Sequence, residues 1–267
     1  MAVITLITDW FNSDYYLGAL KGKLLNLAPE VQIIDINHQI PSFGYSQAAF
    51  ILKNSFHLFP AGTVHIVGVN SEASEDNPFV AIKHKEQYFI GADNGIFGLV
   101  FADSDFKAVK LNIKIKTTFP ELDVFAETAV LLSKGGKFEK LGASYSKLYI
   151  HAPLLPAIDE SVINGSIIYI DSYGNGITNI SHDVFERVEK GRRFEILVQS
   201  NHNKIIQINE SYYETSGGEL LALFNSTGML EIAINKGNAA QLLNLGINSV
   251  VRIKFFDTSE QEELKLT

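Results

Sequence analysis

The stretch AVITLITD, Ala2–Asp9, decides the fold, because it is a run of apolar and β-branched residues that ends in a carboxylate. Apolar side chains on both faces are typical of a buried parallel strand. Outward from it, apolar periodicity predicts helices over Asp14–Leu27 and Tyr45–Ser55 and strands over Val31–Ile36 and Thr63–Val69. This alternation predicts an α/β domain with a mostly parallel, Rossmann-like sheet flanked by helices.

The pattern changes beyond the middle of the chain. A hairpin over 79–90 and a helix over Asp123–Ser133 complete an α/β domain that we place at residues 1–150. Residues 151–164 contain Pro153 and Pro156 and indicate a linker. Short β runs separated by Asn, Gly and Ser follow over 165–267, and they predict an all-β C-terminal domain, a small antiparallel barrel.

The composition narrows the class of partner. The 267 residues carry a formal charge of −8, so the basic surface that nucleic acids require is not expected. There is no cysteine, and the seven histidines show no metal-ligand spacing, so no metal site is expected. Residues 1–7 have no basic n-region, and no apolar run reaches the roughly 18–20 residues of a membrane helix. We therefore expect a cytoplasmic protein without a membrane partner.

The first candidate binding residues follow the first strand. In open α/β sheets, ligands bind beyond the carboxyl ends of the strands, where Asp9 and Trp10 are expected. A carboxylate there can accept both hydroxyls of a ribose. Asp14 fits this role or that of a helix cap. Phe43, after the second strand, fits either a stack on a purine or a plug in the core, and Asn94, in an Asp-Asn-Gly segment, fits an ordinary tight turn.

Two polar loops of the C-terminal half are further candidates. Asp171–Asn179 lies between a strand and a helix-like stretch, and Asp171 could hold an ammonium group there while Tyr173 or Asn175 meets an adenine edge. A plain Asx turn is the alternative. Ser226, in a turn before the small-residue segment 237–240, could bind a carboxylate or a base; the alternative is a hairpin turn followed by a short capped helix.

Taken in order, these segments resemble the family of S-adenosylmethionine hydroxide adenosyltransferases, which includes fluorinases and chlorinases. The resemblance runs from about residue 3 to 256. The matching segments are Thr8-Asp9 with Asp14, Ile34–Pro41, Phe59–His65, Asp93-Asn94-Gly95, Asp171 to Asn179, and Asn225-Ser226 with Gly237–Ala240.

The resemblance implies an α/β domain followed by a β-barrel, a homotrimer, and a ligand held between one subunit's N-domain and its neighbour's C-domain. It implies attack of water or halide at C5′ of S-adenosylmethionine with methionine leaving, and no cofactor besides that substrate. By position, the implied contacts are Asp9 to the ribose, Phe43 beside the ligand, Asp171 to the ammonium, Tyr173 and Asn175 to the adenine, and Ser226 to the carboxylate. Trp10, Asp14 and Asn94 lie in the same matched segments.

The chain departs from the family at the residues that position water. Asn70 stands where the hydrolases have aspartate, Asn77-Pro78 where they have arginine, and Pro120 where they have histidine. An amide is no general base and proline has no donor. Glu121 or Glu72 is the available base in these segments. Glu121 would also repel a halide, which disfavours halogenation.

Three interpretations remain open. The first is a hydrolase that forms adenosine and L-methionine, with Asn70 and Glu121 as the candidate catalytic residues. The second is an adenosyl transferase that uses another nucleophile or substrate. The third is a non-catalytic binder of adenosine or S-adenosylmethionine. The hydrolase ranks first, because the match is long and because water needs little activation to attack a sulfonium.

Overall fold

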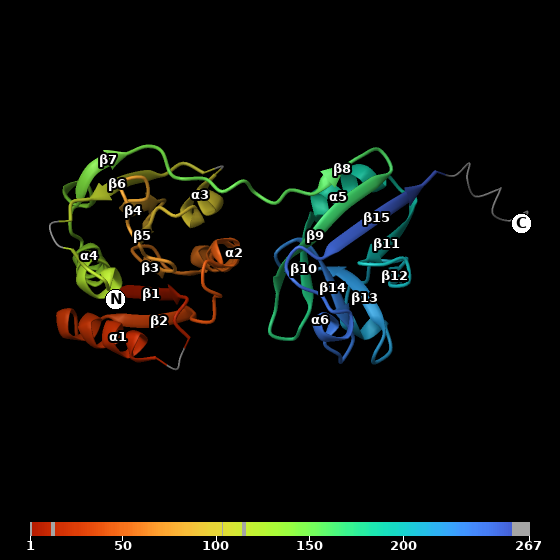
Figure 1. The fold of residues 1–267 in the computed structure, drawn as a ribbon, viewed down its shortest axis with the longest axis horizontal. Coiled ribbons are helices and arrows are strands. Elements are labelled where there is room, and N and C mark those ends of the chain that lie inside the picture. Colours follow the sequence, from red (N-terminus) through yellow and green to blue (C-terminus); the bar gives the residue numbers. More distant parts are fainter. Residues whose placement is uncertain (1, 12–13, 103, 114–115, 258–267) are drawn as a thin grey trace, which may run out of the picture. The chain divides into compact units, whose positions relative to one another are not determined.

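The computed structural model describes residues 2–11, 14–102, 104–113 and 116–257. The chain divides into two compact units, one up to Ala152 and the other from Pro153 (Figure 1). Within the segment expected as a linker, β8 (Ala157–Ile158) pairs with the start of β9 (Val162–Ile170), so these residues are part of the second unit's sheet.

The first unit is built on a seven-stranded sheet in the order β2-β1-β3-β5-β4-β6-β7. Its strands are β1 (Val3–Thr8), β2 (Gln32–Asn37), β3 (Val64–Gly68), β4 (Phe79–His84), β5 (Gln87–Ala92), β6 (Lys107–Leu111) and β7 (Gly142–Tyr145). The pairs β2-β1, β1-β3 and β3-β5 are parallel, and the pairs that involve β4, β6 and β7 are antiparallel. The sheet is therefore mixed, with its parallel half where the sequence predicts it and an antiparallel extension on one side.

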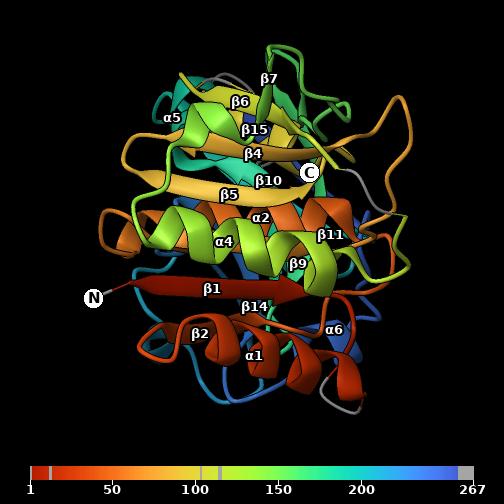
Figure 2. The same cartoon turned by 90° about the vertical axis from the view of Figure 1, so that its left-hand side faces the viewer.

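Helices cover both faces of this sheet (Figure 2). On one face, α1 (Tyr15–Leu27) and α4 (Ala126–Ser133) pack on side chains that include Ile4 and Leu6. On the other, α2 (Tyr45–Ser55) and α3 (Ile96–Phe101) pack around Ile7. Alternate residues of β1 thus enter opposite cores, which is why apolar residues occur on both of its faces.

A wide helical turn precedes α4. Glu121–Phe125 form a π-helical turn in which the Ala126 N–H donates to the Glu121 carbonyl, five residues back. Such turns are rare and occur mostly as single turns within helices, frequently at functional sites. Three short 3₁₀-helices are also present among the described residues: Phe56–Leu58, Phe138–Lys140 and Tyr212–Glu214.

The second unit is an antiparallel, nearly closed barrel in the order β12-β11-β15-β9-β10-β14-β13, whose end strands β12 and β13 approach each other. Its further elements are β10 (Gly176–Ser181), α5 (His182–Glu189), β11 (Arg193–Val198), β12 (Lys204–Ile205), β13 (Leu220–Phe224), β14 (Met229–Ile234), α6 (Ala239–Leu242) and β15 (Val250–Phe256). The prediction of an α/β domain followed by an all-β barrel is confirmed. Strand β10 occupies part of the loop expected at Asp171–Asn179, and the helix-like stretch expected after that loop is present as α5.

The longest described helix, α1, has 13 residues, and among the described residues none combines the length and apolarity that crossing a bilayer requires.

Candidate functional site

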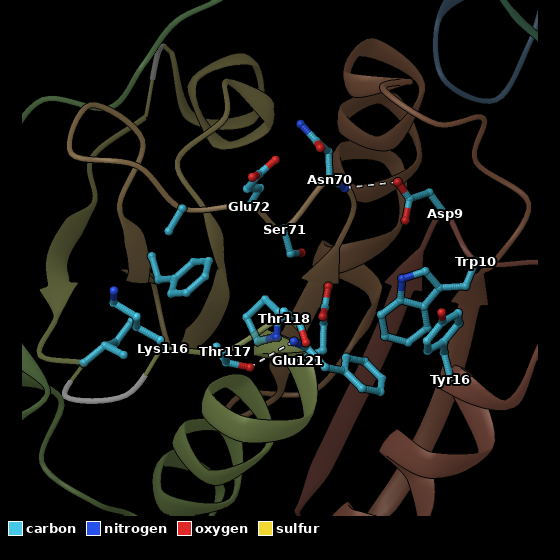
Figure 3. Close-up of a pocket in the computed structure, with 15 residues that line it drawn as sticks. Asp9, Trp10, Tyr16, Asn70, Ser71, Glu72, Lys116, Thr117, Thr118 and Glu121 are labelled. Carbon is cyan, nitrogen blue, oxygen red and sulfur yellow. Dashed lines mark hydrogen bonds between the residues drawn. The ribbon is translucent and has the colours of Figure 1, made fainter.

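A pocket of about 930 Å³ opens at the carboxyl ends of β1 and β3 in the first unit (Figure 3). The residues after β1 contribute Asp9 and Trp10, and those after β3 contribute Ser71. The π-helical turn contributes Glu121 from the floor. In Figure 3 the side chains of Asp9, Ser71 and Glu121 all point into the pocket. This is the edge of the sheet at which the sequence predicts a ligand.

Asp9 is a half-buried carboxylate held by the loop after β3. Its Oδ2 accepts a hydrogen bond from the Asn70 backbone N–H at 3.0 Å. Burial raises the pKa of Asp9, and the Asn70 N–H partly offsets that rise. Behind it, the Thr8 hydroxyl lies 2.8 Å from His38 Nδ1, and His38 Nε2 lies 3.2 Å from Asp35 Oδ1. The strand end that carries Asp9 is therefore fixed from two sides.

Glu121 is the most buried acid of the pocket, with 4% of its surface exposed. Burial raises the pKa of its carboxyl to about 7, the Asp9 carboxylate adds to the rise, and the Ser71 hydroxyl opposes it. Ser71 Oγ approaches this carboxyl without forming a hydrogen bond of ordinary geometry. A carboxyl that is about half ionised at neutral pH can accept a proton from water and release it again.

Asn70 turns its side chain away from Glu121 (Figure 3). Its Nδ2 donates to the Tyr45 hydroxyl at 2.5 Å, and its backbone has a φ of +44°, in the left-handed region. Asn94 supports this conformation, since its Nδ2 donates to the Val69 carbonyl at 2.8 Å and the Asn70 carbonyl at 3.2 Å. Asn70 therefore meets Asp9 through its backbone, and Asn94 is a buried support that does not line the pocket.

An aromatic wall closes one side of the pocket. The Trp10 ring centroid lies 5.9 Å from that of Tyr16 and 5.4 Å from that of Phe119, and Tyr16 and Phe119 lie 5.4 Å apart. Rings in this arrangement offer apolar surface and a favourable environment for a cation. Trp10 was predicted as a site residue from its sequence, but Tyr16, Phe119 and Ser71 were not, because they become neighbours only through folding.

Besides Asn94, two further residues of the first unit that were named from the sequence lie outside this pocket. Asp14 occupies the N-cap position of α1 with extended backbone, but its exposed side chain makes no capping hydrogen bond. Phe43 is 66% exposed, with a φ of +63°. The idea that Phe43 plugs the core is therefore wrong.

In the second unit, Asp171 closes an Asx turn. Its Oδ1 accepts from the N–H groups of Tyr173 and Asn175, both at 2.9 Å, and its Oδ2 accepts from Asn175 Nδ2 at 3.1 Å. Asn175 is buried by this arrangement, whereas Tyr173 is 78% exposed. The turn packs on Asn238, which a Cβ at Gly174 would approach to 2.2 Å.

The turn that contains Ser226 is linked to the same region through a buried acid. Ser226 is exposed, while Glu231 is 3% exposed and accepts from the Tyr212 hydroxyl at 2.5 Å and from Asn225 Nδ2 at 3.1 Å. Burial raises the pKa of Tyr212, and Glu231, Asp171 and Tyr173 add to the rise. Tyr212 thus lies near both turns, and the sequence reasoning missed it. The short capped helix expected near 237–240 is present as α6, capped by Asn238.

Among the described residues, one trio, His182, Asp183 and Glu186, brings potential metal ligands within reach of each other. All three are exposed on α5 of the second unit, and no second feature of the described structure indicates a cation there. The first unit's pocket offers carboxylates, a hydroxyl and aromatic rings, a set suited to an organic ligand.

The fold and the pocket together define a two-domain protein, with an acidic pocket at the carboxyl ends of the parallel strands of an α/β domain and an antiparallel barrel after it. Family models for the N-terminal and C-terminal domains of S-adenosylmethionine hydroxide adenosyltransferases match residues 4–142 and 165–252. The chain belongs to that family.

Named relatives extend over nearly the whole chain. It is 30% identical over 257 residues to an (R)-S-adenosyl-L-methionine hydrolase of Methanocaldococcus jannaschii, covering 91% of this chain and 92% of the relative. It is 26% identical to the enzyme of the same name from Thermus thermophilus, covering 95% and 100%. It is 21% identical to a fluorinase of an Actinoplanes species, covering 94% and 97%. Among solved structures, an uncharacterized conserved protein from Thermotoga maritima matches with a TM-score of 0.84 and 25% identity, covering 95% and 100%.

Proposed function

We propose that this protein hydrolyses S-adenosylmethionine to adenosine and L-methionine, with Glu121 as the general base. The observation that carries the proposal is a buried carboxyl in the pocket with a pKa of about 7, beside Asp9. The relatives named as hydrolases support the reaction class. Asp9 is proposed to accept hydrogen bonds from the ribose hydroxyls.

In the proposed reaction, the Glu121 carboxylate takes a proton from a water molecule as the water oxygen attacks C5′ in line with the sulfur. The bond from C5′ to sulfur breaks, and its electron pair stays on sulfur, so the sulfonium becomes the neutral thioether of methionine. Positive charge on sulfur and negative charge at the base disappear together, and a pocket poor in water favours that loss of charge. Holding the reactants in line contributes further to the rate.

The rest of the substrate is proposed to meet residues of both units. Trp10 and the other rings of the aromatic wall offer a surface for the sulfonium or the ribose. In the second unit, Asp171 is proposed to hold the ammonium group, Ser226 the carboxylate, and Tyr173 and Asn175 the adenine. A homotrimer is part of the proposal, and sedimentation should then give three times the chain mass of 29.6 kDa.

The test is to incubate the pure protein with S-adenosylmethionine and to follow adenosine and methionine by chromatography. Equal amounts of both products, formed well above the uncatalysed rate, are expected. If calorimetry shows binding while no product forms, the hydrolase assignment fails and the binding assignment stands. If neither S-adenosylmethionine nor adenosine binds, both fail.

A non-catalytic adenosyl-binding protein is the second candidate. Two observations favour it: the Asn70 amide is bound to Tyr45 outside the Glu121 region, and Pro120 stands where the family's hydrolases have histidine. An adenosyl transferase with another nucleophile would need that nucleophile at the same place as the water. Halogenation is disfavoured, because a carboxylate at Glu121 repels a halide.

A further inference from the structure

The backbone of Asn70 is held in an unfavourable conformation by contacts from other segments. Its φ of +44° is in the left-handed region, which costs a non-glycine residue of order 1 kcal/mol and persists only where neighbours enforce it. The Tyr45 hydroxyl accepts from Asn70 Nδ2 at 2.5 Å, and Asn94 Nδ2 donates to the Asn70 carbonyl at 3.2 Å. Both ends of the residue are therefore restrained.

His151, near the end of the first unit, contacts both of the residues that restrain Asn70, namely Tyr45 and Asn94. Its ring stacks on Tyr45 with centroids 5.0 Å apart and planes at 25°, and its Nε2 lies 2.9 Å from the Asn94 carbonyl oxygen. Gly95 makes this position possible, because a Cβ there would lie 2.1 Å from His151 Cδ2. His151 therefore fits closely against both residues that restrain Asn70.

These contacts set the direction of the Asn70 backbone N–H group. In the left-handed conformation, the Asn70 N–H donates to Asp9 Oδ2 at 3.0 Å. Tyr45, Asn94 and His151 do not line the pocket of Asp9; they line a second cavity of about 770 Å³, and Asn70 and Glu72 border both cavities. The network thus reaches Asp9 through Asn70, from residues that do not line the pocket of Asp9.

We propose that Tyr45 and His151 are positioning residues for the ribose contact of Asp9, acting through the backbone of Asn70. The inference rests on the proposed function, in which Asp9 accepts the ribose hydroxyls. Tyr45 fixes the Asn70 side chain, His151 fixes Tyr45 and Asn94, and the Asn70 N–H then fixes the direction of the Asp9 carboxylate.

The decisive variant is Tyr45→Phe, which keeps the ring stacked on His151 and removes only the hydroxyl. Loss of one hydrogen bond predicts a rise of about 3- to 10-fold in the Kd for adenosine, measured by calorimetry. His151→Leu, which removes both the stack and the contact with Asn94, should raise it at least as much. The matched control is Tyr88→Phe, on β5, whose ring packs on the core of the other face of the sheet.

A second readout separates positioning from general loosening. The Asn70 N–H holds down the pKa of Asp9, so its misplacement should shift the acid limb of adenosine binding to higher pH. Because Glu121 also faces Asp9, the pH series is measured in the Glu121→Gln background, with and without Tyr45→Phe. Turnover by single Tyr45→Phe should show a higher KM and a nearly unchanged kcat, since Glu121 is not part of the network.

The outcomes are distinguishable. Wild-type protein that binds neither adenosine nor S-adenosylmethionine removes the proposed function. Wild-type protein that binds, together with Tyr45→Phe and His151→Leu variants that bind as tightly as Tyr88→Phe, overturns this inference alone. If His151→Leu does not fold, His151→Phe retains the stack and tests the contact with the Asn94 carbonyl by itself.

Discussion

Gly68 leaves the space that the Glu121 side chain occupies. A Cβ at residue 68, the last residue of β3, would lie 3.0 Å from Glu121 Cγ and 3.1 Å from Oε1, and 3.3 Å from Thr8 Cγ2. The buried carboxyl thus depends on a residue without a side chain in the neighbouring strand.

Gly68→Ala should displace the Glu121 carboxyl while leaving the sheet intact. Overpacking of this kind costs typically about 1–3 kcal/mol of stability, which urea unfolding would measure. We expect kcat for S-adenosylmethionine hydrolysis to fall at least about 10-fold, because a small misplacement of a catalytic group is costly. The double variant Gly68→Ala with Glu121→Ala should recover stability, since it removes the clash. If the stability losses of the two single variants simply add in the double variant, the contact between residue 68 and Glu121 is contradicted.

Glu121→Gln tests the base directly. General base catalysis contributes about 100- to 10,000-fold, so turnover should fall at least about 100-fold while the Kd for adenosine changes little. In the wild-type protein, kcat/KM should rise with pH through about 7, because the carboxyl of the free enzyme must be ionised to accept a proton. The pH dependence near 7 should vanish in any residual activity of the variant. Unchanged turnover would exclude Glu121 from the mechanism.

The same carboxyl should make stability fall as pH rises. Its pKa is about 7 in the folded protein against an ordinary 4.5, so between these values the unfolded chain releases a proton that the folded one keeps. The contribution of Glu121 to the free energy of unfolding is fully present below about pH 4.5. It is lost as the pH rises to about 7, a change of about 3 kcal/mol. Urea unfolding at pH 5 and pH 8 should show a larger loss for wild type than for Glu121→Gln. An equal loss of stability in wild type and Glu121→Gln would contradict the raised pKa of Glu121.

Asp171→Asn tests the proposed ammonium contact, because it removes the charge of Asp171 and keeps an oxygen for the backbone N–H groups of the Asx turn. An amide oxygen can keep accepting from the N–H groups of Tyr173 and Asn175, while the negative charge is lost. If Asp171 holds the ammonium group, the Kd for S-adenosylmethionine should rise about 10- to 100-fold, and that for adenosine should rise much less, through the lost contact with Asn175 Nδ2 alone. Asp183→Asn, an exposed change of the same charge on α5, is the control. Equal effects on both ligands would place the ammonium elsewhere.

Tyr212→Phe should destabilise the second unit. It leaves Glu231, which is 3% exposed, with Asn225 as its remaining side-chain donor among the described residues. The penalty for an incompletely paired buried carboxylate is about 1–3 kcal/mol. The neighbouring Tyr213→Phe is a matched control, since Tyr213 is 90% exposed. Equal urea midpoints for the two variants would show that the hydrogen bond to Glu231 contributes little.

The parallel half of the first sheet was predictable because β1 and β3 are buried on both faces and are therefore rich in apolar residues on both faces. The antiparallel extension was not. In β6, two exposed lysines are separated by two adjacent buried residues, so its five positions show no regular alternation, and β7 has four residues that are exposed or half-buried. The start of β10 was predicted as a loop, because polar residues are typical of loops and Thr178, although polar, is fully buried. Its burial comes from neighbouring strands, which local sequence does not report.

The residues of the candidate site also fall into those that the sequence predicts and those that it does not. Asp9, Trp10 and Glu121 could be named because each stands in a segment with a recognisable strand end or a family match. Tyr45 and His151 could not, since their contacts with Asn70 and Asn94 join residues far apart in the chain. Sequence position gives the type of a side chain, and only the fold gives its direction, as the turned amide of Asn70 illustrates.

The π-helical turn at Glu121–Phe125 makes the site sensitive to chain length. Because successive residues of a helix are about 100° apart, deletion of one residue from this turn would restore α-helical spacing and rotate Glu121 out of the pocket. The packing of α4 against the sheet would remain as it is. A single insertion or deletion, with no substitution at all, is therefore an evolutionary route by which relatives could gain or lose an acid at this position.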